Sequence, residues 1–263
     1  MWRETIFVKF GFSNVPIRTL FNNQNQFLPS IKMKKTILIT GASRGIGYET
    51  AKYFLSNNHR VYVTARTTEK LLSLSNEFPK NCVTITADLS TDVGISTICN
   101  ALNSDNARLD VLINNAGLLI NKPFVESTRN DWQLQLECNL IGPALLIKNM
   151  VNHFNEGSHI INIGSMGGFQ GSSKFPGLSS YSASKGALSI LTECLAGELS
   201  NLKISVNCLC LGAVQTEMLA DAFPGFQAPV LANQMGEYIG TFALDGQKFF
   251  NGKVLPVSLT DPN

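Results

Sequence analysis

Short runs of apolar and β-branched residues alternate along most of the chain with stretches in which apolar positions recur every three or four residues. The short runs predict buried strands, and the periodic stretches predict amphipathic helices. The strands are expected at 36–40, 60–66, 82–89, 110–117, 159–165, 204–212 and 253–259. The helices are expected at 48–57, 67–78, 93–103, 129–155, 181–199 and 230–244.

Alternation of strands and helices is typical of βαβ units, in which each helix leads back to the next parallel strand. The run 110–117 contains three consecutive apolar residues, 111–113, as expected of a strand that is covered on both faces. Right-handed crossovers then predict an α/β, doubly wound sheet of about seven parallel strands with helices on both faces. No linker divides 33–263, so we expect a single domain there.

Residues 1–32 do not follow this pattern, because their aromatic residues are scattered among Asn and Gln without a regular period. They contain no continuous apolar stretch, so a secretory signal is not expected. Three interpretations stay open: a start codon assigned too far upstream, an organelle presequence poor in acidic residues, and a small capping segment. Met33 favours the first, since a chain that begins there enters a strand at once.

Composition excludes several classes of protein. The formal net charge is +2, but the residues from Met33 onward carry 17 basic and 18 acidic side chains. Such a near-neutral body lacks the basic surface that binding to nucleic acid requires. No apolar run reaches the roughly 18 to 20 residues of a membrane span, and the six cysteines form no C-x-x-C pair. We therefore expect a cytoplasmic protein with no nucleic-acid or membrane partner, no metal and no disulfide bonds.

The first predicted strand leads through the glycine-rich turn TGASRGIG, residues 40–47, directly into a helix. Glycine lets the backbone turn tightly and approach a diphosphate, while the helix offers free N–H groups and the positive end of its dipole. A lone glycine-rich turn is a weak signal, but its place in the first βαβ unit strengthens it. The turn therefore predicts a dinucleotide-binding site.

The end of the second strand indicates which dinucleotide binds. An acidic residue there would bond the ribose 2′-hydroxyl of NAD, whereas an arginine accommodates the 2′-phosphate of NADP. The strand ends in Arg66, Arg44 lies in the glycine-rich turn, and no acidic residue is present at either position. This favours NADP(H) over NAD(H), the alternative being that Arg66 is only a solvated charge.

Tyr181 and Lys185 are four residues apart, which places them on one face of a predicted helix. A nearby ammonium favours the phenolate and moves the pKa of a tyrosine from about 10 toward neutrality. Such a tyrosine can give or take a proton during catalysis. A Y-x-x-x-K pair also arises in helices by chance, so the pair alone does not establish a catalytic site.

Several motifs occur together in one order: TGASRGIG at 40–47, NNAG at 114–117, Asn139, Ser165 and YSASK at 181–185. Their order and spacing resemble the short-subunit branch of the short-chain dehydrogenase/reductase family, and the resemblance extends over 33–259. It implies a Rossmann fold and hydride transfer between a nicotinamide cofactor and a carbonyl or alcohol.

The resemblance also implies catalytic roles. Tyr181 is expected to be the acid/base, and Lys185 to lower its pKa and bond the nicotinamide ribose. Ser165 is expected to orient the substrate oxygen, and Asn139 to hold a water in a proton relay. Two alternatives stay open: Ser165 as a small residue required by close packing, and Asn139 as a buried amide that satisfies backbone groups at a helix kink.

The cofactor site implied by the resemblance gathers residues from several loops. Asp88 is expected to face adenine, and Asn115 to brace the central strands on the adenosine side. The full set is Gly41, Ser43, Arg44, Ile46, Gly47, Arg66, Asp88, Leu89, Asn115, Ala116, Gly117, Tyr181, Lys185, Gly212, Val214 and Thr216.

Two departures from the family pattern are visible. Leu211 stands in place of the usual proline before Gly212, and we expect a looser wall behind the nicotinamide because proline would fix φ there. Ser165 and Tyr181 are 16 residues apart, about three more than usual for the family this chain resembles. Ser172 or Ser173 is therefore an alternative to Ser165, which we prefer because it ends a predicted strand.

Residues 217–229 are expected to form a substrate lid. Apolar side chains in the lid and after Ser165 favour an apolar carbonyl, or else simply pack the lid shut. These side chains are Met218, Leu219, Phe223, Phe226, Phe169 and Phe175. The helix 181–199 and the strand 253–259 resemble surfaces that the family uses in homodimers and homotetramers.

The combined hypothesis is an NADP(H)-dependent carbonyl reductase or alcohol dehydrogenase of the carbonyl or ketoacyl reductase type. A catalytically idle NADP(H)-binding regulatory protein is the alternative from another class, and a dehydratase or isomerase is a third. Intact Asn139, Ser165, Tyr181 and Lys185 argue against the idle protein, because a sensor needs no proton chemistry.

Overall fold

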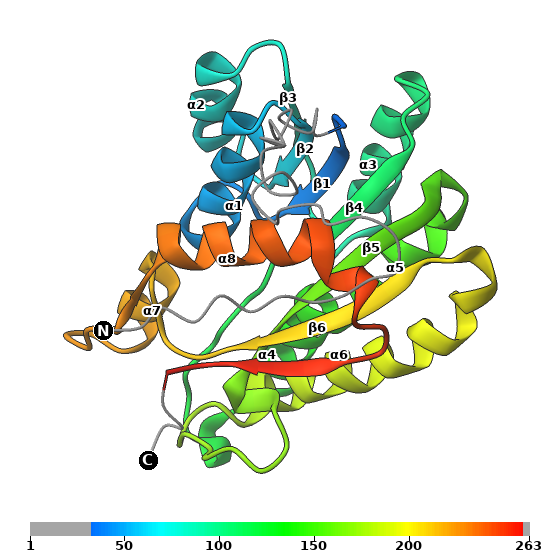
Figure 1. The fold of residues 1–263 in the computed structure, drawn as a ribbon. Helices are drawn as coiled ribbons and strands as arrows, with labels where there is room; N and C mark the ends of the chain where they lie inside the picture. Colours follow the sequence, from blue (N-terminus) through cyan, green and yellow to red (C-terminus); the bar gives the residue numbers. More distant parts are fainter. Residues whose placement is uncertain (1–32, 260–263) are drawn as a thin grey trace, which may run out of the picture. The chain divides into compact units, whose positions relative to one another are not determined.

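The computed structural model describes residues 33–259, which contain one seven-stranded parallel sheet of order β3-β2-β1-β4-β5-β6-β9 (Figure 1). The order reverses between β1 and β4, and in such sheets ligands bind at the carboxyl ends of the strands near that reversal. The predicted doubly wound α/β fold is therefore confirmed. The strands are β1 Thr36–Thr40, β2 Arg60–Ala65, β3 Cys82–Thr86, β4 Leu109–Asn114, β5 Phe154–Ser165, β6 Ser205–Leu211 and β9 Val254–Val257.

Helices α1, α2 and α8 cover one face of the sheet, and α3, α5 and α6 cover the other (Figure 1). Successive strand residues point to opposite faces, so Ile37 and Ile39 contact the first group while Leu38 contacts the second. None of these three side chains is exposed. The helices are α1 Gly45–Ser56, α2 Glu69–Glu77, α3 Asp92–Ser104, α4 Arg129–Leu136, α5 Gly142–Met150, α6 Ser179–Glu198, α7 Glu217–Ala222 and α8 Ala232–Asp245.

The single helix expected at 129–155 is interrupted. A π-helical turn, Glu137–Ile141, separates α4 from α5 and buries Asn139 completely. The start of α5 packs directly on the chain that leaves β3, since a Cβ at Gly142 would lie 2.5 Å from the Leu89 carbonyl oxygen. A π turn inserts one extra residue into a helix and often marks a functional site.

The end of that helix was also predicted too late. Helix α5 ends at Met150, and β5 begins at Phe154, which is buried and pairs with Leu109. The register of β4 against β5 then shifts before Val111 pairs with His159. This irregular segment contains polar residues, so a prediction based on apolar runs did not recognise it as part of a strand.

Two strands end three residues earlier than predicted, and both ends matter for the site. Strand β3 ends at Thr86 and β4 at Asn114, so residues 87–89 and 115–117 lie beyond the sheet. Both segments line a cavity described below. Ala87, Leu89 and Ala116 in these segments resembled a continuation of the strands.

A second, two-stranded sheet was not predicted. It pairs β7, Val214–Gln215, with β8, Val230–Leu231, in parallel. Helix α7 lies between these strands in sequence, and the Thr216 hydroxyl caps it by accepting from the Leu219 N–H at 3.3 Å. The pairing joins the two ends of the segment 217–229, which holds that segment as a closed loop.

The interpretations of residues 1–32 lie outside the described residues. No helix between residues 33 and 259 combines the length and apolarity needed to cross a membrane. All six cysteines carry free thiols. Within residues 33–259, no cluster of His, Cys, Asp or Glu could hold a metal ion.

His159 in β5 gives the fold a pH dependence. It is fully buried, its Nδ1 lies 3.2 Å from the Ala243 carbonyl oxygen, and its Nε2 lies 2.9 Å from Asn207 Nδ2. Nδ1–H therefore donates and neutral Nε2 accepts, and burial lowers the pKa of His159 from 6.5 to about 4. The unfolded chain binds the extra proton between these values, so acid destabilises the fold.

We expect His159 to remove up to about 3 kcal/mol from the free energy of unfolding as the pH falls from 6.5 to 4. Urea unfolding of wild type and His159→Gln at several pH values measures this contribution as the difference in slope. Parallel pH profiles for the two proteins would contradict the assignment.

Candidate active site

A cavity of about 860 Å³ opens at the carboxyl ends of the parallel strands. It is lined by the turn after β1, the chain beyond β2, β3 and β4, the start of α6 and the segment beyond β6. Of the predicted catalytic and cofactor residues, only Gly47 and Asn139 do not line it. Those that do are Gly41, Ser43, Arg44, Ile46, Arg66, Asp88, Leu89, Asn115, Ala116, Gly117, Ser165, Tyr181, Lys185, Gly212, Val214 and Thr216.

The glycine-rich turn has the shape that a diphosphate requires. Gly41 has φ +68°, and a Cβ there would lie 2.7 Å from the Ala116 Cα, so only glycine fits without strain. Helix α1 begins at Gly45 with no side-chain cap from Arg44. Its first N–H groups therefore have no partner within the helix and face the cavity, as in dinucleotide-binding folds.

Asn115 braces this turn from the neighbouring strand. Its Nδ2 donates to the Thr40 and Gly41 carbonyl oxygens, at 3.0 Å each, and its backbone N–H donates to the Thr40 hydroxyl. A Cβ at Gly47 would lie 2.3 Å from the same Nδ2. Gly47 thus lets α1 pack on Asn115, which explains why it lies behind the turn and outside the cavity.

Two exposed arginines line the cavity. Arg66 directly follows β2, and Arg44 belongs to the glycine-rich turn. Arg44 comes within 4.0 Å of Asp221 in α7, whereas Arg66 belongs to none of the ion pairs found among residues 33–259. The pair provides positive charge where the second strand ends.

Asp88 is held at the entrance by its own loop. One of its carboxylate oxygens accepts from the Ser90 backbone N–H at 3.0 Å and from the Ser90 hydroxyl at 2.7 Å. A Cβ at Gly94 would lie 1.9 Å from the Asp88 carbonyl oxygen, so α3 begins in direct backbone contact with this loop. The loop is therefore rigidly placed beside the cavity.

Tyr181 and Ser165 meet inside the cavity. Ser165 ends β5, and its hydroxyl accepts from the Gly167 N–H at 3.1 Å. Burial raises the pKa of Tyr181 above its ordinary value of 10, although the neighbouring Ser165 hydroxyl opposes this. The phenol is therefore protonated at neutral pH.

Lys185 lies one turn further along α6 and is almost fully buried. Its Nζ donates to the Ile163 carbonyl oxygen at 2.8 Å, and burial lowers its pKa. Its ammonium is expected to lower the pKa of Tyr181, and this role stays a prediction. Burial acts on that pKa in the opposite direction.

Asn139 holds the chain beyond β4 to the helices. Its amide nitrogen donates to the Leu118 carbonyl oxygen and the Ser184 hydroxyl, each at 2.9 Å, and its oxygen accepts from the Leu118 N–H at 2.7 Å. Both amide hydrogens are therefore used within the protein. This geometry fits the alternative of a buried amide at a helix kink, since Asn139 lies in the π turn.

Ser172 and Ser173 do not approach Tyr181. The Ser172 hydroxyl donates to the Met166 and Phe169 carbonyl oxygens, and Lys174 Nζ donates to it at 2.7 Å. Ser173 is exposed, and neither serine lines the cavity. The longer spacing between β5 and α6 is therefore taken up by a self-contained loop, which leaves Ser165 as the serine beside Tyr181.

Apolar side chains form the wall on the Tyr181 side. Phe175, before α6, and Phe223, after α7, bring their rings to 6.2 Å between centroids. Phe169 is different, because it packs on Met166 beside Cys208 and Cys210 and does not line the cavity. The other apolar residues of this wall include Leu118, Leu134, Leu178, Met218, Leu219 and Phe226.

Sequence analysis missed two parts of the wall. Leu118 and Leu119 follow β4, while Val257 ends β9 and is followed by residues 258 and 259. Both segments lie at the carboxyl end of a parallel strand, and that position could have predicted that they line the site. Leu211 in turn ends β6 in register with both Ser165 and Val257 and is only 6% exposed.

The chain was compared with known proteins. Residues 35–225 match the short chain dehydrogenase family. The human 3-oxoacyl-[acyl-carrier-protein] reductase is 31% identical over 191 residues, which cover 72% of this chain and 79% of that protein.

Solved structures agree. A short chain dehydrogenase from Burkholderia cenocepacia J2315 in complex with NADP is 26% identical, with a TM-score of 0.76 over 86% of this chain and 96% of that one. A 3-ketoacyl-(acyl-carrier-protein) reductase from Brucella melitensis complexed with NADH is also 26% identical, with a TM-score of 0.75 over 85% of this chain and 96% of that one. Together with the family match, these likenesses establish that the chain belongs to the short-chain dehydrogenase family of oxidoreductases.

Proposed function

We propose that this protein is an NADP(H)-dependent reductase of apolar carbonyl compounds, with Tyr181 as the proton donor. One observation carries the proposal: the Tyr181–Ser165 hydroxyl pair lies in the same cavity as the glycine-rich turn. A substrate oxygen bound to the two hydroxyls would share the cavity with a nucleotide held by that turn.

The turn, the free N–H groups of α1 and the two arginines fit the phosphates of a nicotinamide dinucleotide. When bound in its reduced form, the nicotinamide supplies the hydride. Ser165 and Tyr181 donate hydrogen bonds to the carbonyl oxygen and polarise it. As the carbon takes the hydride, the C=O π electrons move to oxygen, which takes the Tyr181 proton and leaves a phenolate.

The raised pKa of Tyr181 suits reduction. A phenol that stays protonated at neutral pH is ready to donate, whereas oxidation of an alcohol would need the phenolate first. Lys185 and its ammonium group lie one helical turn away and would favour the phenolate once it forms. These residues therefore fit proton donation to a carbonyl oxygen and stabilisation of the phenolate that results.

Arg66 and Arg44 support NADP(H) over NAD(H). Guanidinium groups bind a 2′-phosphate through charge-assisted hydrogen bonds, and the residue that directly follows β2, where an acidic residue would accept a ribose 2′-hydroxyl, is Arg66. The similar proteins include one solved with NADP and one with NADH, so the preference rests on these side chains.

Exposed apolar residues and free thiols suggest how copies of the chain assemble and in which compartment the protein is found. Exposed apolar residues lie on α6, where Ile190 is 61% exposed, and just before β9, where Phe249 is 79% exposed. We propose that these surfaces join copies of the chain in a homodimer or homotetramer. Six free thiols favour a reducing compartment, and we propose the cytoplasm.

Fluorescence titration with NADPH and NADH tests the cofactor, and loss of NADPH absorbance tests the reaction. We expect oxidation with 4-nitrobenzaldehyde, acetophenone or 9,10-phenanthrenequinone, and none with dihydroxyacetone phosphate. Tight NADPH binding without turnover of any probe would overturn the reductase in favour of an idle nucleotide-binding protein. No binding of either nucleotide would overturn both.

A further inference from the structure

Residues 118–122, here called the strap, connect the site's walls. The strap follows β4, and Leu118 and Leu119 line the cavity. Asn121 Nδ2 donates to the Ala222 carbonyl oxygen of α7 at 2.9 Å, and the Lys122 N–H donates to the Gly177 carbonyl oxygen at 2.9 Å. The strap therefore anchors both the α7 segment and the loop before α6.

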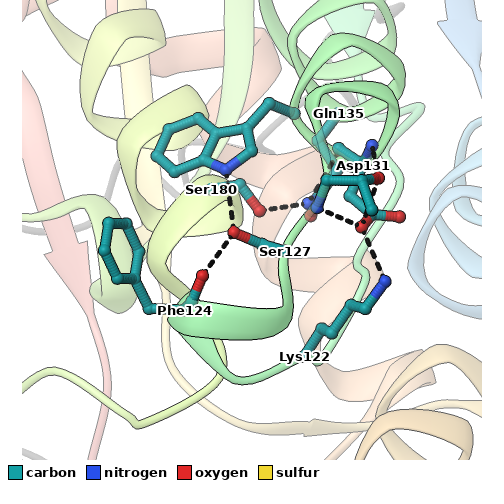
Figure 2. A network of polar contacts seen from close by, with 8 residues as sticks. Lys122, Phe124, Ser127, Asp131, Gln135 and Ser180 are labelled. Carbon is teal, nitrogen blue, oxygen red and sulfur yellow. Dashed lines mark hydrogen bonds and ion pairs between the residues drawn. The ribbon is translucent and has the colours of Figure 1, made fainter.

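One buried side chain attaches the strap to the helices beneath it. Gln135 of α4 has no exposed surface, and its Oε1 accepts from the Ile120 N–H at 3.0 Å. Its Nε2 donates to the Ser180 hydroxyl and to the Asp131 carbonyl oxygen (Figure 2). The Asp131 carboxylate in turn forms an ion pair with Lys122 Nζ at 2.9 Å. This ion pair is a second attachment of the strap to α4.

Ser180 is the residue immediately before Tyr181, in the first turn of α6. Gln135 thus joins the strap to the turn that carries the Tyr181 hydroxyl. An amide costs free energy to bury unless its hydrogen bonds are made, and all the bonds of Gln135 go to segments that border the cavity. An apolar side chain could fill the same space between α4 and α6 without these bonds.

We propose that Gln135 is a positioning residue for the reductase reaction, a role that rests on the proposed function. It fixes the first turn of α6 relative to the strap, and so places the Tyr181 hydroxyl against a substrate that packs on Leu118 and Leu119. Gln135 itself touches neither cofactor nor substrate, since it does not line the cavity.

The test compares Gln135→Leu with Gln133→Leu, the same substitution at an exposed position of the same helix. We expect Gln135→Leu to lower kcat for 9,10-phenanthrenequinone about tenfold or more, because small displacements of a catalytic group are costly. The Kd for NADPH should stay within about twofold, since the hydrogen bonds of Gln135, Ser180 and Asp131 within residues 33–259 include neither the glycine-rich turn nor Arg66. Gln133→Leu should match wild type in both.

Ser180→Ala removes the same hydrogen bond from the α6 side. If Gln135→Leu does not fold, the kcat and the Kd for NADPH of Ser180→Ala test whether this bond positions Tyr181. If Gln135 acts through Ser180, the double variant should be about as slow as Gln135→Leu alone. Additive losses, or a Kd for NADPH that weakens in parallel with kcat, would show a general structural role and overturn the proposal. An inactive wild type would overturn the reductase itself, whereas an active wild type with an equally active Gln135→Leu would overturn only the role of Gln135.

Discussion

Tyr181→Phe should lower carbonyl reduction by at least about 10³-fold while NADPH still binds. The substitution removes only the hydroxyl, which is the proposed proton donor and the partner of Ser165. The aromatic ring stays in its place at the start of α6, and the glycine-rich turn is untouched. Stopped-flow or steady-state absorbance assays measure turnover, and fluorescence titration measures the Kd for NADPH.

Tyr238→Phe is the matched control, because it removes a hydroxyl from a tyrosine of α8 that is 44% exposed and does not line the cavity. It should keep wild-type turnover. Turnover that persists in Tyr181→Phe would refute the assignment of Tyr181 as the acid. A Kd for NADPH that rises with the loss of turnover would instead show that the hydroxyl serves the nucleotide site.

The architecture could be predicted because burial on both faces makes the strands of a parallel sheet apolar nearly throughout. Ile37, Leu38 and Ile39 are all buried, and the sequence shows them as one short run. The same logic located the cavity, since the carboxyl ends of such strands meet at one edge. It failed just beyond the sheet, as after β3, where Ala87 and Leu89 resemble a continuation of the strand.

The π turn could not be predicted, because its cause lies in distant contacts. Asn139 bonds Leu118, which is 21 residues earlier in sequence, and Gly142 packs on Leu89. Local periodicity carries no information about such contacts. The small two-stranded sheet was missed for a related reason, since two residues are too short a run to show alternation.

The site's electrostatics depended on tertiary structure most of all. The four-residue spacing of Tyr181 and Lys185 correctly placed them on one helix, and the interpretation that Lys185 lowers the pKa of Tyr181 followed from that spacing. Spacing says nothing of burial, which raises the pKa of Tyr181 and lowers that of Lys185. Nor does the spacing show that the Lys185 ammonium donates a hydrogen bond to the Ile163 carbonyl oxygen. Gln135 was missed because two of its partners, Ile120 and Ser180, come from segments outside its own helix.

Arg66→Asp should reverse the cofactor preference. The arginine directly follows β2, at the position where the ribose of the adenosine half is recognised in this fold. A carboxylate there would repel a 2′-phosphate and accept a hydrogen bond from a 2′-hydroxyl. Each charge-assisted hydrogen bond contributes about 1.5–3 kcal/mol, so the ratio of kcat/KM for NADPH over NADH should fall by about 10² to 10³-fold.

The control is Arg129→Asp, which makes the same change of charge at an exposed position at the start of α4, outside the cavity. Its ratio should equal that of wild type, which separates a local contact from the general field of the protein. An unchanged ratio in Arg66→Asp would refute the 2′-phosphate role.

Arg44 offers a graded comparison with Arg66. Its guanidinium already lies 4.0 Å from Asp221, and the side chains of Arg44 and Asp221 are 43% and 75% exposed. The ion pair is therefore weak and easily exchanged for a phosphate. Arg44→Gln should therefore weaken NADPH binding without improving NADH, because it removes a cation and supplies no carboxylate for a 2′-hydroxyl. Since only Arg66→Asp both repels the phosphate and serves the hydroxyl, a full reversal should require that substitution. A reversal by Arg44→Gln alone would move the 2′-phosphate contact from the end of β2 to the glycine-rich turn.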